Sequence, residues 1–237
     1  IIFENVERLT QDTLLDVLGT SAANGKGQTD RLMLTEKETF AQWNGGGWQE
    51  IFPPEGILSR WVPWNWLTLV MVITMSVLPL ALMLMKFLPD KGFLLAKPLG
   101  IVIVSYIVWL LVSLKVATFS ATTIYLAIGL VGIVSFGMAY WQRTELNSLV
   151  RERWRLWLIE EGIFVVVFLA FFGLRLANPD LWHPWRGGEK FMELAYLTAT
   201  TKSTFMPPYD PWFAGGYLNY YYYGYFIVGL LGKALGI

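Results

Sequence analysis

The chain has 237 residues, of which 55% are hydrophobic, 16% aromatic and 15% charged. Because a soluble domain normally carries about 25% charged residues, this composition excludes an ordinary water-soluble fold and favours a chain that lies largely in a bilayer. The formal net charge is zero, cysteine is absent and His183 is the only histidine, so nothing points to nucleic acid, and thiol chemistry and multi-histidine zinc sites are excluded here.

Residues 1–60 are polar and of mixed composition, and we expect them to form the extracytoplasmic tail of a preceding module. The chain begins at Ile1 and ends at Ile237 within an apolar run. We therefore expect an internal piece of a longer protein, whose partners include the rest of the parent polypeptide. A tryptophan cluster that begins at Trp61 follows the tail and is typical of a membrane interface.

Five apolar runs follow the tail, and each is a candidate membrane-spanning helix because about 20 apolar residues cross the hydrocarbon core. The runs cover residues 66–88, 98–114, 120–141, 162–177 and 220–237. The first three predict a three-helix bundle over residues 61–141, and the last two begin a second core over residues 162–237. The predicted fold class is an all-α integral membrane protein with about five transmembrane helices and an interfacial helix in an outer loop.

Residues 142–161 are predicted to form an amphipathic linker helix on the inner membrane face. Its apolar stripe, which includes Leu146, lies opposite Arg151 on a helical wheel. Glu160 and Glu161 are expected to open the fourth span, where carboxylates suit the positive end of a helix.

The distribution of basic residues predicts the orientation of the chain. They concentrate after the first and third spans, at Lys86, Lys91, Lys97, Arg143, Arg151, Arg153 and Arg155. By the positive-inside rule these two loops are cytoplasmic. Residues 1–60 and the loop 178–219 would then lie on the extracytoplasmic side of the plasma membrane.

The loop 178–219 gathers acidic, basic and aromatic residues between two spans, and we expect a surface helix over residues 189–202. Glu189 and Glu193 are four residues apart and share one helical face. Either carboxylate could act as a general base at a dry site close to the membrane. The plainer interpretation is an interfacial helix with solvated charges and aromatic anchors.

Basic residues near this loop are candidates for binding an anion. Arg186 could hold a phosphate with two hydrogen bonds and Lys190 as a point charge. Arg175, near the outer end of the fourth span, could bind a lipid phosphate or extend outward to the interface.

Further candidates for substrate binding are His183, Asp210, Tyr220, Tyr221 and Tyr222. His183 has a structural alternative because nothing near it forms a triad, and Asp210 could simply form a turn before Pro211. The tyrosines 220–223 are expected to cover all faces of one helical turn. Some must then point into the protein, where a phenol needs a hydrogen-bond partner.

Four segments resemble the YYY membrane protein family of archaea and Chloroflexi. They are LPDKGFLLAKPLG at 88–100, HPWRGGEK at 183–190, PYDPWFAGG at 208–216 and YYYYG at 220–224. The order of a span, a surface helix and a Pro- and Tyr-rich segment is also similar to the first outer loop of GT-C-fold glycosyltransferases. Asp210-Pro-Trp-Phe resembles a motif of oligosaccharyltransferases.

These resemblances imply a GT-C-like partial bundle and a membrane glycosyltransferase that moves a sugar from a polyprenyl-phosphate donor to an acceptor at the outer face. The similar mannosyltransferases have an Asp-Glu pair where this chain has Glu189-Lys190, so the base is either Glu189 or Glu193. No cofactor is implied with certainty, and a divalent metal stays open. The expected partners are membrane lipid and the sugar donor. A non-catalytic scaffold or transporter component is the alternative.

Overall fold

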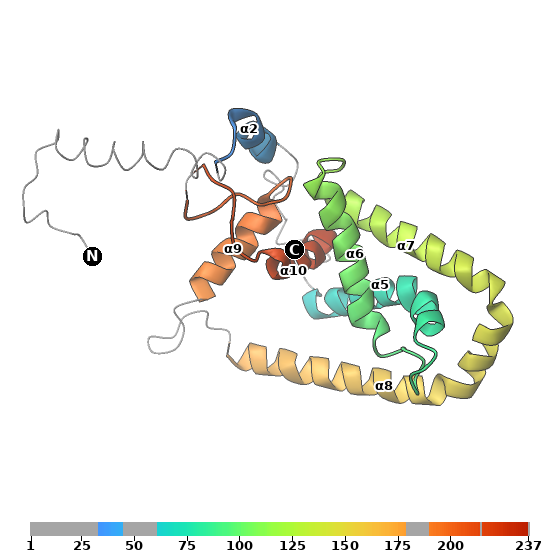
Figure 1. The fold of residues 1–237 in the computed structure, drawn as a ribbon. Helices are drawn as coiled ribbons and strands as arrows, with labels where there is room; N and C mark the ends of the chain where they lie inside the picture. Colours follow the sequence, from blue (N-terminus) through green and yellow to red (C-terminus); the bar gives the residue numbers. More distant parts are fainter. Residues whose placement is uncertain (1–32, 45–60, 179–189, 214, 237) are drawn as a thin grey trace, which may run out of the picture.

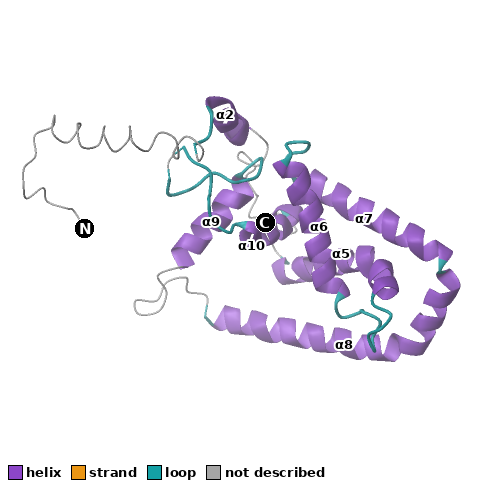
Figure 2. Cartoon of the chain, in the orientation of Figure 1, coloured by secondary structure: helices purple, strands orange, loops and turns teal. Residues whose placement is uncertain are grey.

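The computed structural model of the protein describes residues 33–44, 61–178, 190–213 and 215–236. Within these ranges the chain is helical and contains no strand (Figure 2). The helices are α2 (Glu36–Asn44), α5 (Val62–Leu84), α6 (Ala96–Ser113), α7 (Ala121–Trp141), α8 (Arg143–Ala177), α9 (Lys190–Lys202) and α10 (Tyr223–Leu235).

Four of these helices, α5 to α8, are long and apolar enough to cross a membrane. The prediction of an all-α integral membrane protein is therefore confirmed. The predicted spans 66–88, 98–114 and 120–141 correspond to α5, α6 and α7.

The core lies where α5 packs against α6, α7 and α10 (Figure 1). The buried face of α5 includes Leu69, Ile73 and Val77. These residues are spaced by four, and this spacing places their side chains on one side of the helix. Val104 and Val108 face them from α6 with the same spacing.

Gly100 permits a close crossing of α5 and α6. A Cβ atom at this position would meet Ile73 Cγ2 at 3.0 Å and the Ile73 carbonyl oxygen at 3.1 Å. Small residues at helix crossings let two backbones approach closely in a membrane, where packing replaces the hydrophobic effect as the driving force. Gly229 plays the same part in α10, where a Cβ would lie 2.7 Å from Thr201 Oγ1 of α9.

The predicted linker helix 142–161 and the predicted fourth span form one continuous helix, α8, of 35 residues. At 1.5 Å per residue it is about 52 Å long, and Figure 1 shows it along one edge of the molecule. Glu160 and Glu161 therefore do not open a helix. Glu161 instead accepts a hydrogen bond of 2.6 Å from Lys97 Nζ of α6, whose side chain is 5% exposed.

The loop between α5 and α6 also attaches to the first half of α8. Trp157 Nε1 donates to the Asp90 carbonyl oxygen at 2.9 Å, and the Trp157 ring stacks on Phe93 at 5.0 Å. Lys86 pairs with Glu145 at 2.7 Å. We call this end of the bundle, which carries the basic loops, the basic end.

Residues 220–237 are predicted to form the start or the whole of a fifth span. The helix in this run, α10, begins at Tyr223, three residues later than expected. In the segment before it, Tyr217 bridges Tyr209. Gly236 ends α10 with φ +68°, a left-handed conformation that favours glycine.

Replacing Gly100 with Ala should lower stability by about 1–3 kcal/mol, because the new methyl group would collide with Ile73. The matched control is Gly129→Ala in α7, where a Cβ has no neighbour within 4 Å and the substitution should be neutral or stabilising. Thermal unfolding in detergent compares the two variants. Equal midpoints would contradict the close crossing.

Candidate functional site

A cleft between α8, α9 and α10 brings together three of the predicted site residues. Arg175 comes from the last turn of α8, and Lys190 and Glu193 come from the first turn of α9. They line a cavity of about 350 Å³ together with Leu194, Leu197, Tyr225 and Val228. We call this cavity the cationic cleft.

The periodicity of α9 explains why these side chains share the cleft. Lys190, Glu193, Leu194 and Leu197 occupy positions i, i+3, i+4 and i+7, which form one helical face. The face carries its charges at the start of α9 and its leucines further along. The cleft therefore has an ionic part and an apolar part.

Two of the ionic side chains, Arg175 and Glu193, differ in their surroundings. Arg175 is exposed, and its Nη1 donates to the Asn178 carbonyl oxygen at 3.1 Å, which holds the guanidinium near the end of α8. Glu193 is exposed and makes no hydrogen bond or ion pair with the residues that the structure describes. Its carboxylate is therefore available to a ligand, and two cationic side chains line the same cavity.

A second cavity, of about 370 Å³, is lined by aromatic side chains of α6 and of the tyrosine run: Tyr106, Trp109, Tyr220, Tyr221, Tyr222 and Tyr223. We call it the tyrosine groove. Tyr196 of α9 lies between the two cavities, because its ring is 5.7 Å from the Tyr220 ring and 5.9 Å from the Tyr225 ring. The cationic cleft and the tyrosine groove are thus neighbours.

The tyrosines do not share one helical turn, contrary to the prediction, because Tyr220 and Tyr221 precede α10 and Tyr222 is its N-cap. The expectation that some phenols point inward and find partners is confirmed. Tyr222 Oη accepts a hydrogen bond of 3.0 Å from Trp109 Nε1, and Tyr223 Oη lies 3.1 Å from Ser105 Oγ. These two bonds fix the start of α10 against α6.

Tyr220 and Tyr221 form a stacked pair at the surface, with ring centroids 3.9 Å apart. The Tyr220 hydroxyl donates to the Tyr221 hydroxyl at 2.6 Å, and this hydrogen bond raises the pKa of Tyr220 to about 12. The Tyr220 phenol therefore stays neutral at physiological pH. The pair offers ring faces and hydroxyl groups to a ligand.

Asp210 adopts the turn-forming role that was its structural alternative. Its Oδ1 accepts hydrogen bonds from the amides of Trp212 at 2.8 Å and Phe213 at 3.0 Å. Its carboxylate lines neither the cationic cleft nor the tyrosine groove. Three other predicted site residues, Glu189, His183 and Arg186, lie outside the described residues.

The described ranges contain no group of three Asp, Glu or His side chains that could hold a metal ion. Glu193 is the single carboxylate of the cationic cleft within them.

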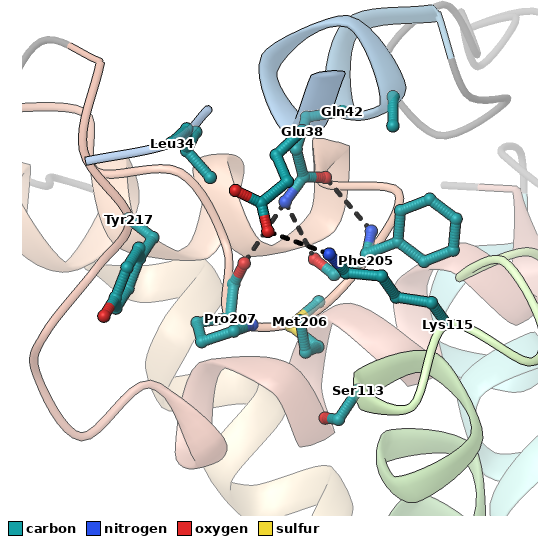
Figure 3. A pocket seen from close by; sticks show the side chains of 10 residues that line it. Leu34, Glu38, Gln42, Ser113, Lys115, Phe205, Met206, Pro207 and Tyr217 are labelled. Carbon is teal, nitrogen blue, oxygen red and sulfur yellow. Dashed lines mark hydrogen bonds and ion pairs between the residues drawn. The ribbon is translucent and has the colours of Figure 1, made fainter. Parts of the chain in front are cut away.

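The segment that follows α9 is held in place by one glutamine of α2. Gln42 is 3% exposed, and its Oε1 accepts hydrogen bonds from the amides of Thr204 at 2.8 Å and Phe205 at 3.0 Å. Its Nε2 donates to the carbonyl oxygens of Phe205 at 3.1 Å and Pro207 at 3.2 Å (Figure 3). This side chain thereby uses both of its donors and both of its acceptor positions.

We call α2 together with residues 203–213 and 215–222 the cap. The cap is also joined to the bundle, because the Phe119 amide of the α6–α7 loop donates to the Thr204 carbonyl oxygen at 2.8 Å. Lys233 of α10 is 1% exposed, and its Nζ donates to the Phe119 carbonyl oxygen at 2.7 Å. The cap, this loop and α10 are therefore one hydrogen-bonded unit.

A small cavity of about 190 Å³ lies under α2 (Figure 3). At its edge Glu38 forms an ion pair of 2.9 Å with Lys115. The hydrogen bond that Lys115 donates within this pair, together with two hydrogen bonds from Thr35, lowers the pKa of Glu38 from 4.5 to about 2.

Sequence reasoning missed several of these residues, and some carried a readable signal. Thr35 and Glu38 form a capping box, in which each side chain binds the amide of the other residue. The Thr-x-x-Glu spacing could have predicted the start of α2. Tyr196 and Tyr225 carried no such signal, because their places beside the cleft depend on how α9 and α10 cross.

Comparison with known proteins adds one match. The sequence model of a family described as an uncharacterized membrane protein (DUF2298) matches residues 103–237, which is more than half of the chain. This match includes the cationic cleft and the tyrosine groove. No curated protein and no solved structure matches the chain.

Replacing Gln42 with Leu should destabilise the cap, because four backbone groups at residues 204–207 would lose their partners. Each buried group left unsatisfied costs about 1–3 kcal/mol. Hydrogen exchange of residues 203–213 should accelerate by at least about tenfold. The control is Gln142→Leu at the basic end, where the side chain accepts from Lys86 and does not contact the cap. Unchanged exchange in Gln42→Leu would contradict this role.

Acid should weaken the attachment of α2 to the bundle, because the pKa of Glu38 is lower in the folded state than its ordinary value. The ion pair therefore stabilises the docked helix fully above pH 4.5, and this contribution is lost as the pH falls toward 2. The ion pair is partly exposed and Gln42 still holds α2, so the effect should be modest. Limited proteolysis near residues 36–44 at decreasing pH measures this effect. Glu38→Gln should abolish the acid dependence and Glu36→Gln should keep it; equal profiles for both would contradict the assignment.

Proposed function

Because the chain belongs to the DUF2298 family of uncharacterized membrane proteins, whose description names no reaction, we propose its function from the site itself. The proposal is a membrane glycosyltransferase that transfers a sugar from a polyprenyl-phosphate donor to an acceptor hydroxyl. One observation carries it: Arg175, Lys190 and Glu193, from two different helices, line a single cavity.

The charges of the cationic cleft suit a phosphate that leaves during the reaction. A guanidinium can bind two phosphate oxygens at once, and an ammonium adds a point charge. Arg175 and Lys190 would stabilise the negative charge that develops on the phosphate as its bond to the sugar breaks. Leu194 and Leu197 in the same cavity suit the first isoprene units of the lipid.

Glu193 would act as the general base. Its carboxylate would take the proton of the acceptor hydroxyl, and the resulting oxygen would attack the anomeric carbon of the sugar. A bond from this carbon to the acceptor oxygen forms while the bond to the phosphate oxygen breaks, and polyprenyl phosphate leaves. Glu189, next to Lys190 in the sequence, is the alternative base.

The tyrosine groove would hold the sugar or the acceptor. The phenol rings present flat apolar faces to the C–H groups of a sugar, and their hydroxyls can bind sugar hydroxyls. Tyr196 connects the groove to the cleft, so a sugar could lie in one while its phosphate lies in the other. Asp210 would contribute by fixing the turn of the cap.

We place this site at the extracytoplasmic face of the plasma membrane. The cap and the cleft lie at the end of α8 that carries Arg175, whereas Arg151 and Arg155 lie toward its other end. The 24 residues between Arg151 and Arg175 span about 36 Å along a helix, enough to cross the hydrocarbon core. The positive-inside rule then assigns the basic end to the cytoplasm.

A transporter component is the second candidate, because Lys97 and Glu161 form an ion pair between two membrane-spanning helices. Charges inside a membrane often mark a transport pathway. Lys97, however, lies in the first turn of α6, near the basic end, whereas transporter sites lie near the bilayer midplane. The ion pair is therefore better explained as a structural contact between α6 and α8 than as a substrate site.

The test is transfer by the full-length protein in liposomes, with polyprenyl-phosphate mannose and polyprenyl-phosphate glucose as donors and release of polyprenyl phosphate as the readout. Glu193→Gln should lower kcat by at least about 100-fold, since it removes a general base. Lys190→Gln should lower kcat/KM by about tenfold through loss of one charged contact to the phosphate.

Lys202→Gln is the matched control, because Lys202 lies at the other end of α9 and does not line the cleft. It should leave both constants unchanged. Full transfer activity in a Glu189→Gln/Glu193→Gln double variant would refute the proposed base and, with it, this mechanism.

A further inference from the structure

A large apolar groove of about 560 Å³ lies at the basic end, between α5, α7 and α8. Its walls are apolar side chains of all three helices, such as Leu78, Phe136 and Val150. Two side chains at the start of α8 supply polar groups to the same cavity, Arg143 and Asn147. The groove is therefore amphipathic along its length.

The Arg143 guanidinium is held by an aromatic ring, and its N–H donors are not used by the described residues. It lies over the Tyr140 ring, with 5.1 Å between the guanidinium carbon and the ring centroid. It makes no hydrogen bond or ion pair with the described residues. Because stacking on a ring engages the guanidinium face and leaves its edge, five N–H donors stay available to a ligand.

The order of polar and apolar groups matches a phospholipid. Arg143 marks the end of the bundle where α7 passes into α8. From Leu82 to Met75 the lining follows α5 for seven residues, about 10 Å along its axis, and all of these lining side chains are apolar. A ligand with an anionic head at Arg143 and a hydrocarbon tail along α5 would satisfy both parts.

The charge around the groove selects an anionic headgroup over a zwitterionic one. Lys86 contacts Gln142, the residue before Arg143, but is paired with Glu145, so the excess positive charge near the groove comes from arginines. The same stretch of α8 carries Arg151, Arg153 and Arg155. Basic residues at the end of a membrane bundle attract anionic lipids, and basic pockets between helices bind their headgroups.

We propose that this groove is a binding site for an anionic phospholipid. Arg143 and Asn147 hold the phosphate, and one acyl chain lies along α5 between α7 and α8. This site lies at the opposite end of the bundle from the cationic cleft and does not depend on the proposed transferase function.

Native mass spectrometry of the detergent-solubilised full-length protein tests the site with phosphatidylglycerol and phosphatidylcholine as probes. The unmodified protein should retain phosphatidylglycerol in preference to phosphatidylcholine. Arg143→Gln should weaken phosphatidylglycerol binding by about tenfold, the loss expected for one charge-assisted contact. Arg151→Gln removes an exposed arginine of the same helix that does not line the groove. Because this arginine adds only to the screened charge around the groove, its loss should weaken binding far less than Arg143→Gln does.

A second variant tests the apolar part of the groove without removing a charge. Val150 is 45% exposed and lines the groove, so Val150→Trp should fill it and reduce retention of phosphatidylglycerol. Equal retention of the two lipids by the unmodified protein would overturn the proposal, as would equal losses in Arg143→Gln and Arg151→Gln. A lipid-independent dimer disrupted by Val150→Trp would instead assign the groove to a second copy of the chain.

Discussion

The cap depends on one buried amide. Gln42 satisfies four backbone groups at residues 204–207, and hydrogen bonding lets this irregular segment be buried without unpaired polar groups. Through Thr204 and Phe119 the same network reaches Lys233 in α10. The position of the tyrosine groove follows from it, because Tyr220, Tyr221 and Tyr222 belong to the cap and Tyr223 begins α10.

The bundle has different chemistry at its two ends. At one end the cap holds tyrosines beside the cationic cleft. At the other end basic side chains surround an apolar groove. A single helix, α8, connects the two and contributes Arg175 to the cleft and Arg143 to the groove. Each of the two cavities therefore combines a cation with an apolar wall, which suits an amphiphile.

The sequence predicted the first three spans well, because uninterrupted apolar runs need only the bilayer to become helices. The sequence did not predict that α8 is one continuous helix, because the charges of residues 143–161 suggested a separate linker. The partner of Glu161 is Lys97, which lies 64 residues away and could not be identified from local sequence. The sequence also failed for the tyrosine run because Trp109 and Ser105 of α6 hold Tyr222 and Tyr223. Arg175, Lys190 and Glu193 were predicted as candidates, but their meeting in one cleft depends on helix packing.

The cap also constrains the order of assembly. Gln42 precedes all four spans, and its partner Thr204, 162 residues away, follows them. Closing such a long loop is entropically costly until the helices between its ends are in place. During synthesis Gln42 therefore cannot make these hydrogen bonds until Thr204 has been made, after α5 to α9.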